Sequence, residues 1–332
     1  MGTFRFGKPQ ATSTVSMTEV SQFRIHGLGV ESDVELDGDR DRETSIDTWV
    51  RGRPDESALA DPGDGVIVAE FVAAGRRWWT ATEKESGYLL RFHDKCDVEI
   101  DSQLTTLVYR PAPSCDPEAV SLLVSGTGLS LLLGLRGSLV LHASGIQIGD
   151  GSVAFAGLPG MGKSTLAGLL CSVGGHLISD DALRVDIDAN PRCFRGTNKV
   201  RLRRTAASVI DLFSDTIPGI SPDDRLTLRP EPSEPECNLS ALVIPYPSRH
   251  ASRFSTERID SAEAVFRLSP FLRIAKWCRP DLVSQHFLQL GDLVQKVPVY
   301  GLTVPWSTPF TGKFALALSA TVEALATEKP IN

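Results

Sequence analysis

The chain has little of several residue types, and each shortage excludes a class of protein. Its six cysteines are scattered with no Cys-x-x-Cys spacing, which argues against a zinc site and against a disulfide framework. We therefore expect reduced thiols, as in a cytoplasmic protein. Long runs of Lys or Arg are absent and the net charge is −7, so we expect no nucleic-acid partner.

Long hydrophobic runs are also missing. The segment after Met1 lacks the apolar core of a signal peptide, and the most apolar run, residues 120–135, is shorter than a bilayer span and contains three glycines. We expect this run to be a buried helix, and we expect no membrane partner.

The 332 residues, 42% of them hydrophobic, suffice for two domains or one large one. Residues 1–19 are polar and aperiodic, which predicts disorder. Short strand-like runs separated by turn residues follow, and they predict an antiparallel β-rich N-terminal domain over residues 20–112. The runs are 22–30, 48–52, 65–72, 77–80, 87–93, 96–100 and 104–109. A proline-rich linker then leads to a second domain over residues 118–332.

Two features of the N-terminal domain give local expectations. Residues 35–43 are highly charged with few apolar residues, which favours a solvated loop over a metal site. Trp78 and Trp79 are adjacent on a predicted strand, so one should face the core and the other the rim. We expect this domain to recognise the substrate, because no other role is apparent for it.

The most informative stretch is residues 154–165, which follows an apolar strand and leads into a predicted helix. Glycine, four further residues and Gly-Lys-Ser form the pattern in which backbone N–H groups surround phosphates. Lys163 would reach the terminal phosphates of ATP, and the Ser164 hydroxyl would bind Mg²⁺. The predicted nucleotide-binding residues are Gly157, Leu158, Pro159, Gly160, Met161, Gly162, Lys163, Ser164 and Thr165.

The flanking segments describe the surrounding sheet. Gly149-Asp150-Gly151 between two alternating runs predicts a hairpin, so the strand that enters the phosphate loop should have an antiparallel neighbour in a mixed sheet. His142 ends the strand before this hairpin, where a structural and a functional role are equally supported.

A strand ending in Asp180-Asp181 is predicted directly after the phosphate-loop helix. A crossover helix connects parallel strands, so both carboxylates should lie at the same sheet edge as the phosphate loop. Side chains at a strand end point in different directions. One aspartate could therefore hold Mg²⁺ while the other acts as a base on an attacking hydroxyl. A solvated acidic turn is the alternative.

These motifs together resemble the catalytic core of the HPr kinase/phosphorylase family. The matching segments are Leu-Val-Leu-His142, the phosphate loop and Gly-His-Leu-Ile-Ser-Asp-Asp181. The resemblance implies an HPr-kinase-like α/β phosphate-loop domain that uses ATP and Mg²⁺, with Asp180 as the leading candidate base. It also implies Asp181 on the metal, and His142 positioning the acceptor or the phosphoryl group.

Further segments, 23–33, 136–144 and 297–302, look like the HPr-kinase-related proteins found with lasso-peptide genes. That likeness implies a serine kinase whose acceptor is a peptide or small protein, such as a lasso precursor peptide or an HPr-like protein. Thr165 stands where HPr enzymes carry an acidic residue, and their downstream glycine-rich signature is missing, so phosphorylase activity is not expected.

Other readings stay open at this point. They are a nucleotide-gated binding module without phosphotransfer and a small-molecule kinase. Whichever applies, the protein could form a homo-oligomer. Residues 197–203 alternate and put Lys199, Arg201 and Arg203 on one strand face, where they could stabilise phosphoryl transfer or form a solvated edge. Thr205 is expected to cap a following helix that runs through Phe213.

Overall fold

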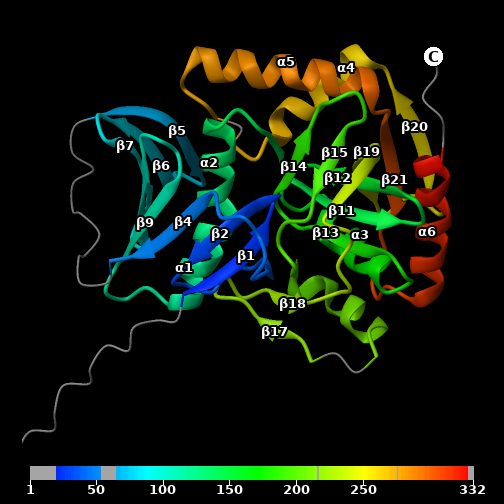
Figure 1. Ribbon diagram of the computed structural model, residues 1–332. Coiled ribbons are helices and arrows are strands. Elements are labelled where there is room, and N and C mark those ends of the chain that lie inside the picture. The colour runs from blue at the N-terminus through cyan, green and yellow to red at the C-terminus, as the bar shows by residue number, and fades with distance from the viewer. Residues whose placement is uncertain (1–19, 54–64, 215–216, 275, 328–332) are drawn as a thin grey trace, which may run out of the picture.

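The computed structural model describes residues 20–53, 65–214, 217–274 and 276–327, so the expected disorder of residues 1–19 lies outside the described part. The N-terminal strands form one nine-stranded sheet, seen at the left of Figure 1. In spatial order they are β3 (Asp39–Arg40), β1 (Ser21–Ile25), β2 (Leu28–Ser32), β4 (Thr48–Gly52), β9 (Thr106–Pro111), β8 (Cys96–Asp101), β7 (Gly87–Phe92), β6 (Arg76–Lys84) and β5 (Val66–Ala73).

This sheet corrects two expectations from the sequence. The run 22–30 is not one strand but the hairpin β1–β2, because His26 (φ 53°) and Gly27 (φ 73°) both adopt left-handed backbone and reverse the chain. The sheet is not purely antiparallel either, since β4 pairs in parallel with both β2 and β9. The expectation for the tryptophans is confirmed, with Trp79 8% and Trp78 45% exposed.

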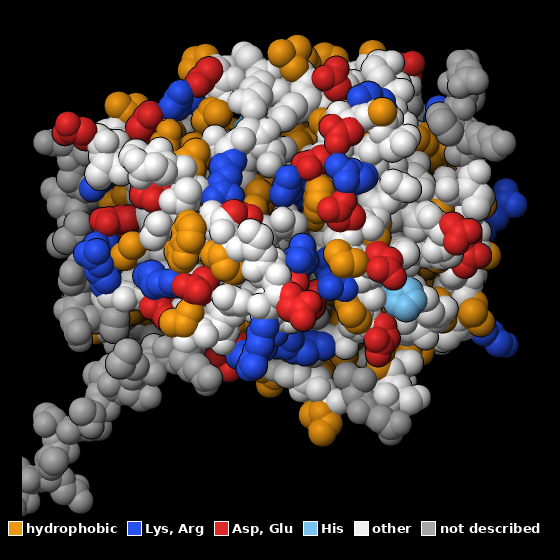
Figure 2. Space-filling view, viewed as in Figure 1, with side chains coloured by type: hydrophobic (Ala, Val, Ile, Leu, Met, Phe, Trp, Pro, Cys, Tyr) orange, Lys and Arg blue, Asp and Glu red, His pale blue; other side chains and the backbone are white. Residues whose placement is uncertain are grey.

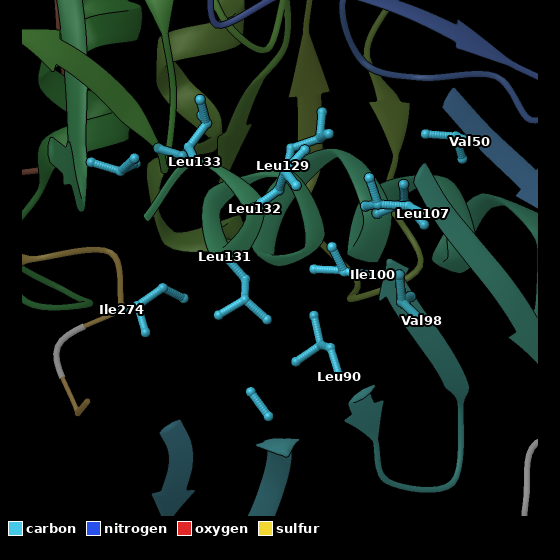
Figure 3. Close-up of a cluster of buried hydrophobic side chains, with 14 of the residues drawn as sticks. Val50, Leu90, Val98, Ile100, Leu107, Leu129, Leu131, Leu132, Leu133 and Ile274 are labelled. Atoms are coloured by element: carbon cyan, nitrogen blue, oxygen red, sulfur yellow. The ribbon is translucent and has the colours of Figure 1, made fainter. Parts of the chain in front are cut away.

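The apolar run that follows is helical and packs against this sheet. It consists of α1 (Pro117–Leu123), a π-helical turn η1 (Val124–Gly128) and α2 (Leu129–Leu135). The Asp116 carboxylate caps its start by accepting from the Glu118 N–H at 2.9 Å. Figure 3 shows leucines of α2 facing sheet residues such as Leu90 and Ile100.

Length and apolarity alone would let residues 117–135 span a membrane, but 67% of the most apolar window is buried inside the protein. The expectation of a buried core helix is therefore confirmed. The core that this helix completes also takes up Ile274 and Trp277, so it extends beyond the residues predicted for the N-terminal domain.

The second large sheet is mixed, as expected from the hairpin signal. Strand β12 pairs antiparallel with β11 and parallel with β19, while β13 is antiparallel to β11 and so runs in the same direction as β12. Its main path is β10 (Leu139–Leu141), β14 (Leu183–Asp186), β15 (Arg192–Phe194), β19 (Glu236–Ser248), β12 (Gly151–Ala156), β11 (Ala143–Ile148) and β13 (His176–Ser179), and β21 (Val299–Pro305) joins β19 to β20 (Ser255–Ile259).

Helices cover both faces of this second sheet, as side-chain alternation along β12 requires. Phe155 packs with α3 (Lys163–Cys171) and α6 (Gly312–Thr327), whereas Ala154 faces α4 (Ser261–Leu268) and α5 (Pro280–Lys296). The molecule is thus an α/β fold with a mixed sheet, preceded by a β-rich N-terminal part.

A third, small sheet lies beside the phosphate-loop region. It consists of β16 (Val200–Leu202), β18 (Leu226–Leu228) and β17 (Gly219–Ile220), and the 3₁₀ helix η2 (Arg204–Leu212) follows β16. The expected helix is present, but the prediction that Thr205 caps it is wrong, because Arg203 is the cap residue and no side chain caps the turn. Ala206 also departs from helical geometry.

The acidic segment 35–43 joins the two halves of the molecule, so the prediction of a solvated loop is also wrong. Asp37 forms an ion pair with Lys199, and Asp39 with Arg195. Leu36 is buried in the first core, which anchors the segment. Elsewhere on the surface, Figure 2 shows Lys and Arg side chains interspersed with Asp and Glu.

Candidate active site

The phosphate-loop segment connects β12 to α3 at the edge of the second sheet. Gly160 (φ 97°) and Gly162 (φ 88°) adopt left-handed backbone, which only glycine takes without strain. No side chain caps the first turn of α3, so its N–H groups remain open to an anion at the positive end of the helix. The predicted helix start is confirmed, and Gly174 (φ 100°) adopts left-handed backbone shortly after the helix ends.

Lys163 begins α3 and its ammonium group is held inside the loop. Its side chain donates to the carbonyl oxygens of Gly157 at 2.8 Å and Leu158 at 3.3 Å. The ammonium nitrogen lies 3.0 Å from Nε2 of His142, which emerges between β10 and β11. Burial lowers the pKa of Lys163 to about 8.

Asp180 follows β13 and contacts the phosphate loop directly. It is 3% exposed, and its Oδ1 accepts hydrogen bonds from Ser164 Oγ at 2.8 Å and Ser144 Oγ at 2.6 Å. Its Oδ2 accepts from the backbone N–H of Arg201 at 3.0 Å. This carboxylate is therefore the one beside the serine hydroxyl predicted to bind Mg²⁺.

Asp181 points into a different environment, as expected for adjacent residues at a strand end. Its backbone is left-handed (φ 73°), and its carboxylate lies 3.0 Å from Arg273, 3.3 Å from Arg201 and 3.2 Å from Nδ1 of His142. Burial alone would raise the pKa of this carboxyl, but Arg273, His142 and Arg201 together hold it well below its usual range. Asp181 is therefore ionised at neutral pH.

His142 lies between the Lys163 ammonium group and the Asp181 carboxylate. Its Nε2 faces Lys163, and its Nδ1 faces both the carboxylate and the carbonyl oxygen of Asp181, the latter at 3.0 Å. The backbone N–H of His142 donates to the Phe271 carbonyl at 2.6 Å, which fixes the ring relative to the sheet.

These groups border a cavity of about 670 Å³ that contains both the phosphate loop and Asp181. Its walls carry a concentration of positive charge that suits a polyphosphate. The arginines are Arg201, Arg203, Arg225 and Arg249. Arg201 and Arg203 were expected from the strand pattern, and Lys199 pairs with Asp37 instead.

Four residues near the phosphate loop and Asp181 carry no signal in the sequence. Arg225 and Arg249 line the cavity, Arg273 pairs with Asp181, and the Trp306 ring covers Gly162. They lie between 62 and 143 positions downstream of Lys163 in segments without a motif. Only the arrangement of strands and loops brings them to this edge.

The residues present fit an ATP-bound magnesium ion. Among the described residues, no three His, Cys, Asp or Glu side chains are arranged to hold a metal by themselves. The Ser164 and Asp180 oxygens are 2.8 Å apart, which is a suitable pair for a metal that also retains phosphate and water ligands.

Comparisons with known proteins add little to this geometry. No family model matches the chain, and no curated protein matches it. A solved structure, "Structure of the Hpr(Ser) kinase/phosphatase from Coxiella burnetii", aligns with 56% of this chain and 94% of its own, at 13% identity and a TM-score of 0.29. At that similarity the alignment carries no argument about activity, which has to come from the site itself.

Proposed function

We propose that the protein is an ATP- and Mg²⁺-dependent kinase that phosphorylates a serine hydroxyl on a peptide or small protein. One observation carries this proposal. A phosphate loop with a buried lysine shares a cavity with the Asp181 carboxylate, and a second carboxylate, that of Asp180, accepts a hydrogen bond from Ser164 of the loop. Phosphoryl transfer needs both an anion cradle and a carboxylate that can accept a hydroxyl proton.

The loop backbone, Lys163 and the arginines bind and neutralise the phosphates. Lys163 is already positioned by the Gly157 and Leu158 carbonyls, so little conformational freedom is lost when it meets a phosphate oxygen. Arg201 lies between Asp181 and Asp223, where it can shift from these carboxylates toward developing negative charge. Ser164 and Asp180 would hold Mg²⁺, which would supply positive charge to the phosphates.

The roles that we assign to the two aspartates are the reverse of those that the family resemblance implies. Asp180 bonds to Ser164 and is buried, which suits a metal-side ligand. Asp181 borders the cavity, is ionised, and lies beside His142, which suits a base that orients an incoming hydroxyl. We accordingly assign the metal side to Asp180 and Ser164, the base to Asp181, and positioning of Asp181 to His142.

The test is intact-mass spectrometry of candidate acceptors after incubation with the purified protein and Mg-ATP. Acceptors are HPr, a lasso precursor peptide and a panel of serine peptides, and the variants are Lys163→Ala and Asp181→Asn. An added phosphate on one acceptor, absent with both variants, is the expected result. ATP binding without transfer to any acceptor would instead favour a nucleotide-gated binding module, and transfer only to small hydroxyl compounds a small-molecule kinase.

A further inference from the structure

A second cavity of about 650 Å³ opens from the catalytic one toward the N-terminal sheet. His142, Asp181 and Arg201 line both spaces, so the two adjoin at the residue assigned as base. Its volume lies within the range of about 300–1,000 Å³ typical of ligand sites. We call this space the acceptor groove.

The floor of the acceptor groove is a row of aromatic side chains on three neighbouring strands. Phe71 on β5 is directly opposite Trp79 on β6, and Trp79 is directly opposite Phe92 on β7. The Phe71 and Trp79 rings are stacked with centroids 6.4 Å apart. Trp78 borders the same groove and is 45% exposed, with Arg76 over its ring at 5.0 Å.

The walls come from both halves of the molecule. Leu122 and Leu123 of α1 form one side, and Leu272 and Arg273 form another beside the active site. An apolar groove of this size, open at one end to a catalytic carboxylate, suits a side chain that lies next to the reacting group.

The charged residues around the groove indicate the charge of the ligand. Among the described residues that line it, five are basic and three acidic, in a protein whose net charge is −7. The basic side chains are Arg76, Lys95, Arg201, Arg273 and Lys276. An excess of positive charge in an acidic protein favours an acidic ligand over a neutral or basic one.

We propose that the acceptor groove binds an acidic peptide that carries an aromatic or large aliphatic residue close to the serine to be phosphorylated. This inference rests on the proposed kinase function and names the substrate class of the same site. The apolar side chain packs against Phe71 and Trp78, the exposed aromatic side chains of the groove. Acidic side chains meet Arg76, Lys95 and Lys276. The serine hydroxyl then reaches Asp181 at the inner end.

The reaction at that point is balanced with ATP as the phosphoryl donor. The hydroxyl oxygen forms a bond to the γ-phosphorus, and the bond from that phosphorus to the β,γ-bridging oxygen breaks. ADP leaves, and the hydroxyl proton passes to the Asp181 carboxylate.

A library of short peptides with one fixed central serine, scanned one flanking position at a time, tests the proposal. We expect a preference for Phe, Tyr, Trp or Leu at one or two nearby positions and for Glu or Asp over Lys further out. For the preferred peptide, Phe71→Ala and Trp78→Ala should each raise KM about tenfold and leave kcat near wild type, since they remove binding area away from the chemistry.

Val72→Ala is the matched control, because Val72 is 38% exposed on the same strand as Phe71, at 40%, and does not line the groove. Its KM should equal that of the wild type. Should a groove variant fail to fold, a preferred peptide with a photoreactive phenylalanine analogue provides a second measurement on the wild-type protein. Its cross-links should map to residues of the groove.

Several outcomes would overturn the groove assignment. Among them are phosphorylation that is indifferent to flanking residues, groove variants that behave like Val72→Ala, and cross-links that map elsewhere. Absence of phosphorylation on every peptide while Mg-ATP binds in a Lys163-dependent manner would also overturn it and leave the kinase open for other acceptors. Absence of Mg-ATP binding would instead refute the proposed function itself.

Discussion

Lys163 is buried, and its surroundings disfavour the charged form of its amine. Burial lowers its pKa, while the carboxylates of Asp180 and Asp181 act in the opposite direction and keep much of the charge at neutral pH. Two carbonyl oxygens, those of Gly157 and Leu158, and Nε2 of His142 surround the ammonium group and hold it in one place. A phosphate that enters the loop would replace this arrangement with a stronger, charge-assisted one.

The pH dependence of nucleotide binding should reveal this lysine. A bound phosphate favours the charged amine and raises its pKa. The binding contribution is therefore complete below about 8, the pKa in the free protein, and is lost progressively as pH rises above that value toward the higher pKa of the bound state. We expect the affinity for ADP, measured by isothermal calorimetry, to fall roughly tenfold from pH 7 to pH 9.5. Lys163→Arg keeps its charge throughout, so its affinity should stay nearly constant, and equal slopes for both proteins would contradict the assignment.

Neutralising each aspartate in turn should affect different steps, namely phosphoryl transfer or Mg²⁺-dependent nucleotide binding. Asp181→Asn removes the base and leaves the Ser164–Asp180 contact in place, so transfer should fall by on the order of 10² or more while Mg-ATP binding is largely kept. Asp180→Asn should mainly weaken Mg²⁺-dependent nucleotide binding. Binding titrations with and without Mg²⁺, together with single-turnover transfer, distinguish them. The opposite pattern would return the base to Asp180.

At the scale of elements, the phosphate loop is held between its own helix and a residue from the far end of the chain. A Cβ on Gly162 would lie 2.6 Å from the Trp306 ring, and Trp306 packs edge-on against Phe310, which in turn contacts Phe314 of α6. The loop conformation is therefore supported by the last helix as well as by its own glycines.

Gly162→Ala should consequently be more damaging than a comparable change elsewhere. Gly149 in the β11–β12 turn also has left-handed backbone (φ 56°), but a Cβ added there would meet no atom within 4 Å. Gly149→Ala should cost about 1–2 kcal/mol from backbone strain alone. Gly162→Ala adds the clash with Trp306, so its melting temperature should fall further and ADP binding should weaken. Equal decreases in the melting temperature of the two variants would show that the Trp306 ring moves aside without cost.

At the scale of the whole molecule, the N-terminal sheet supports the strand end that carries the two aspartates. The β1–β2 turn inserts His26 next to Gly196 and Ser179, and its N–H donates to the Arg195 carbonyl at 2.7 Å. The Asp37–Lys199 and Asp39–Arg195 pairs lie on the same side. The two halves therefore meet directly behind the candidate active site.

This junction should make the fold sensitive to acid. His26 is fully buried and neither ring nitrogen has a hydrogen-bond partner among the described residues; burial, with Arg184 and Arg273 nearby, lowers its pKa to about 3. The unfolded chain takes up the proton near pH 6.5, so stability is complete above that pH and is lost as pH falls toward 3. At pH 5 the loss should be about 2 kcal/mol.

Urea unfolding at several pH values checks this expectation. His26→Asn is the comparison variant, because asparagine tolerates the left-handed backbone of this position and does not titrate. The variant should be less stable at pH 8 but should lose less stability between pH 7 and pH 5 than the wild type. Parallel curves for the two proteins would exclude His26 as the group responsible.

Local spacing in the sequence was enough to predict the core of the site. Glycines at fixed positions require the loop conformation, the Gly149–Gly151 turn requires the β11–β12 hairpin, and the short α3 crossover brings Asp180 and Asp181 back to the loop edge. These features depend on residues within about 40 positions of one another, since turn chemistry and side-chain periodicity act over short distances.

Only the tertiary structure decided how those residues are used. Which aspartate faces Ser164 depends on the left-handed backbone at Asp181 and on Arg273, which arrives from a segment after α4. The acidic segment 35–43 looked solvated by composition, yet it pairs with Lys199 and Arg195. Ion pairs and cavities between distant segments follow from how two sheets pack together, and no local pattern in the chain records that packing.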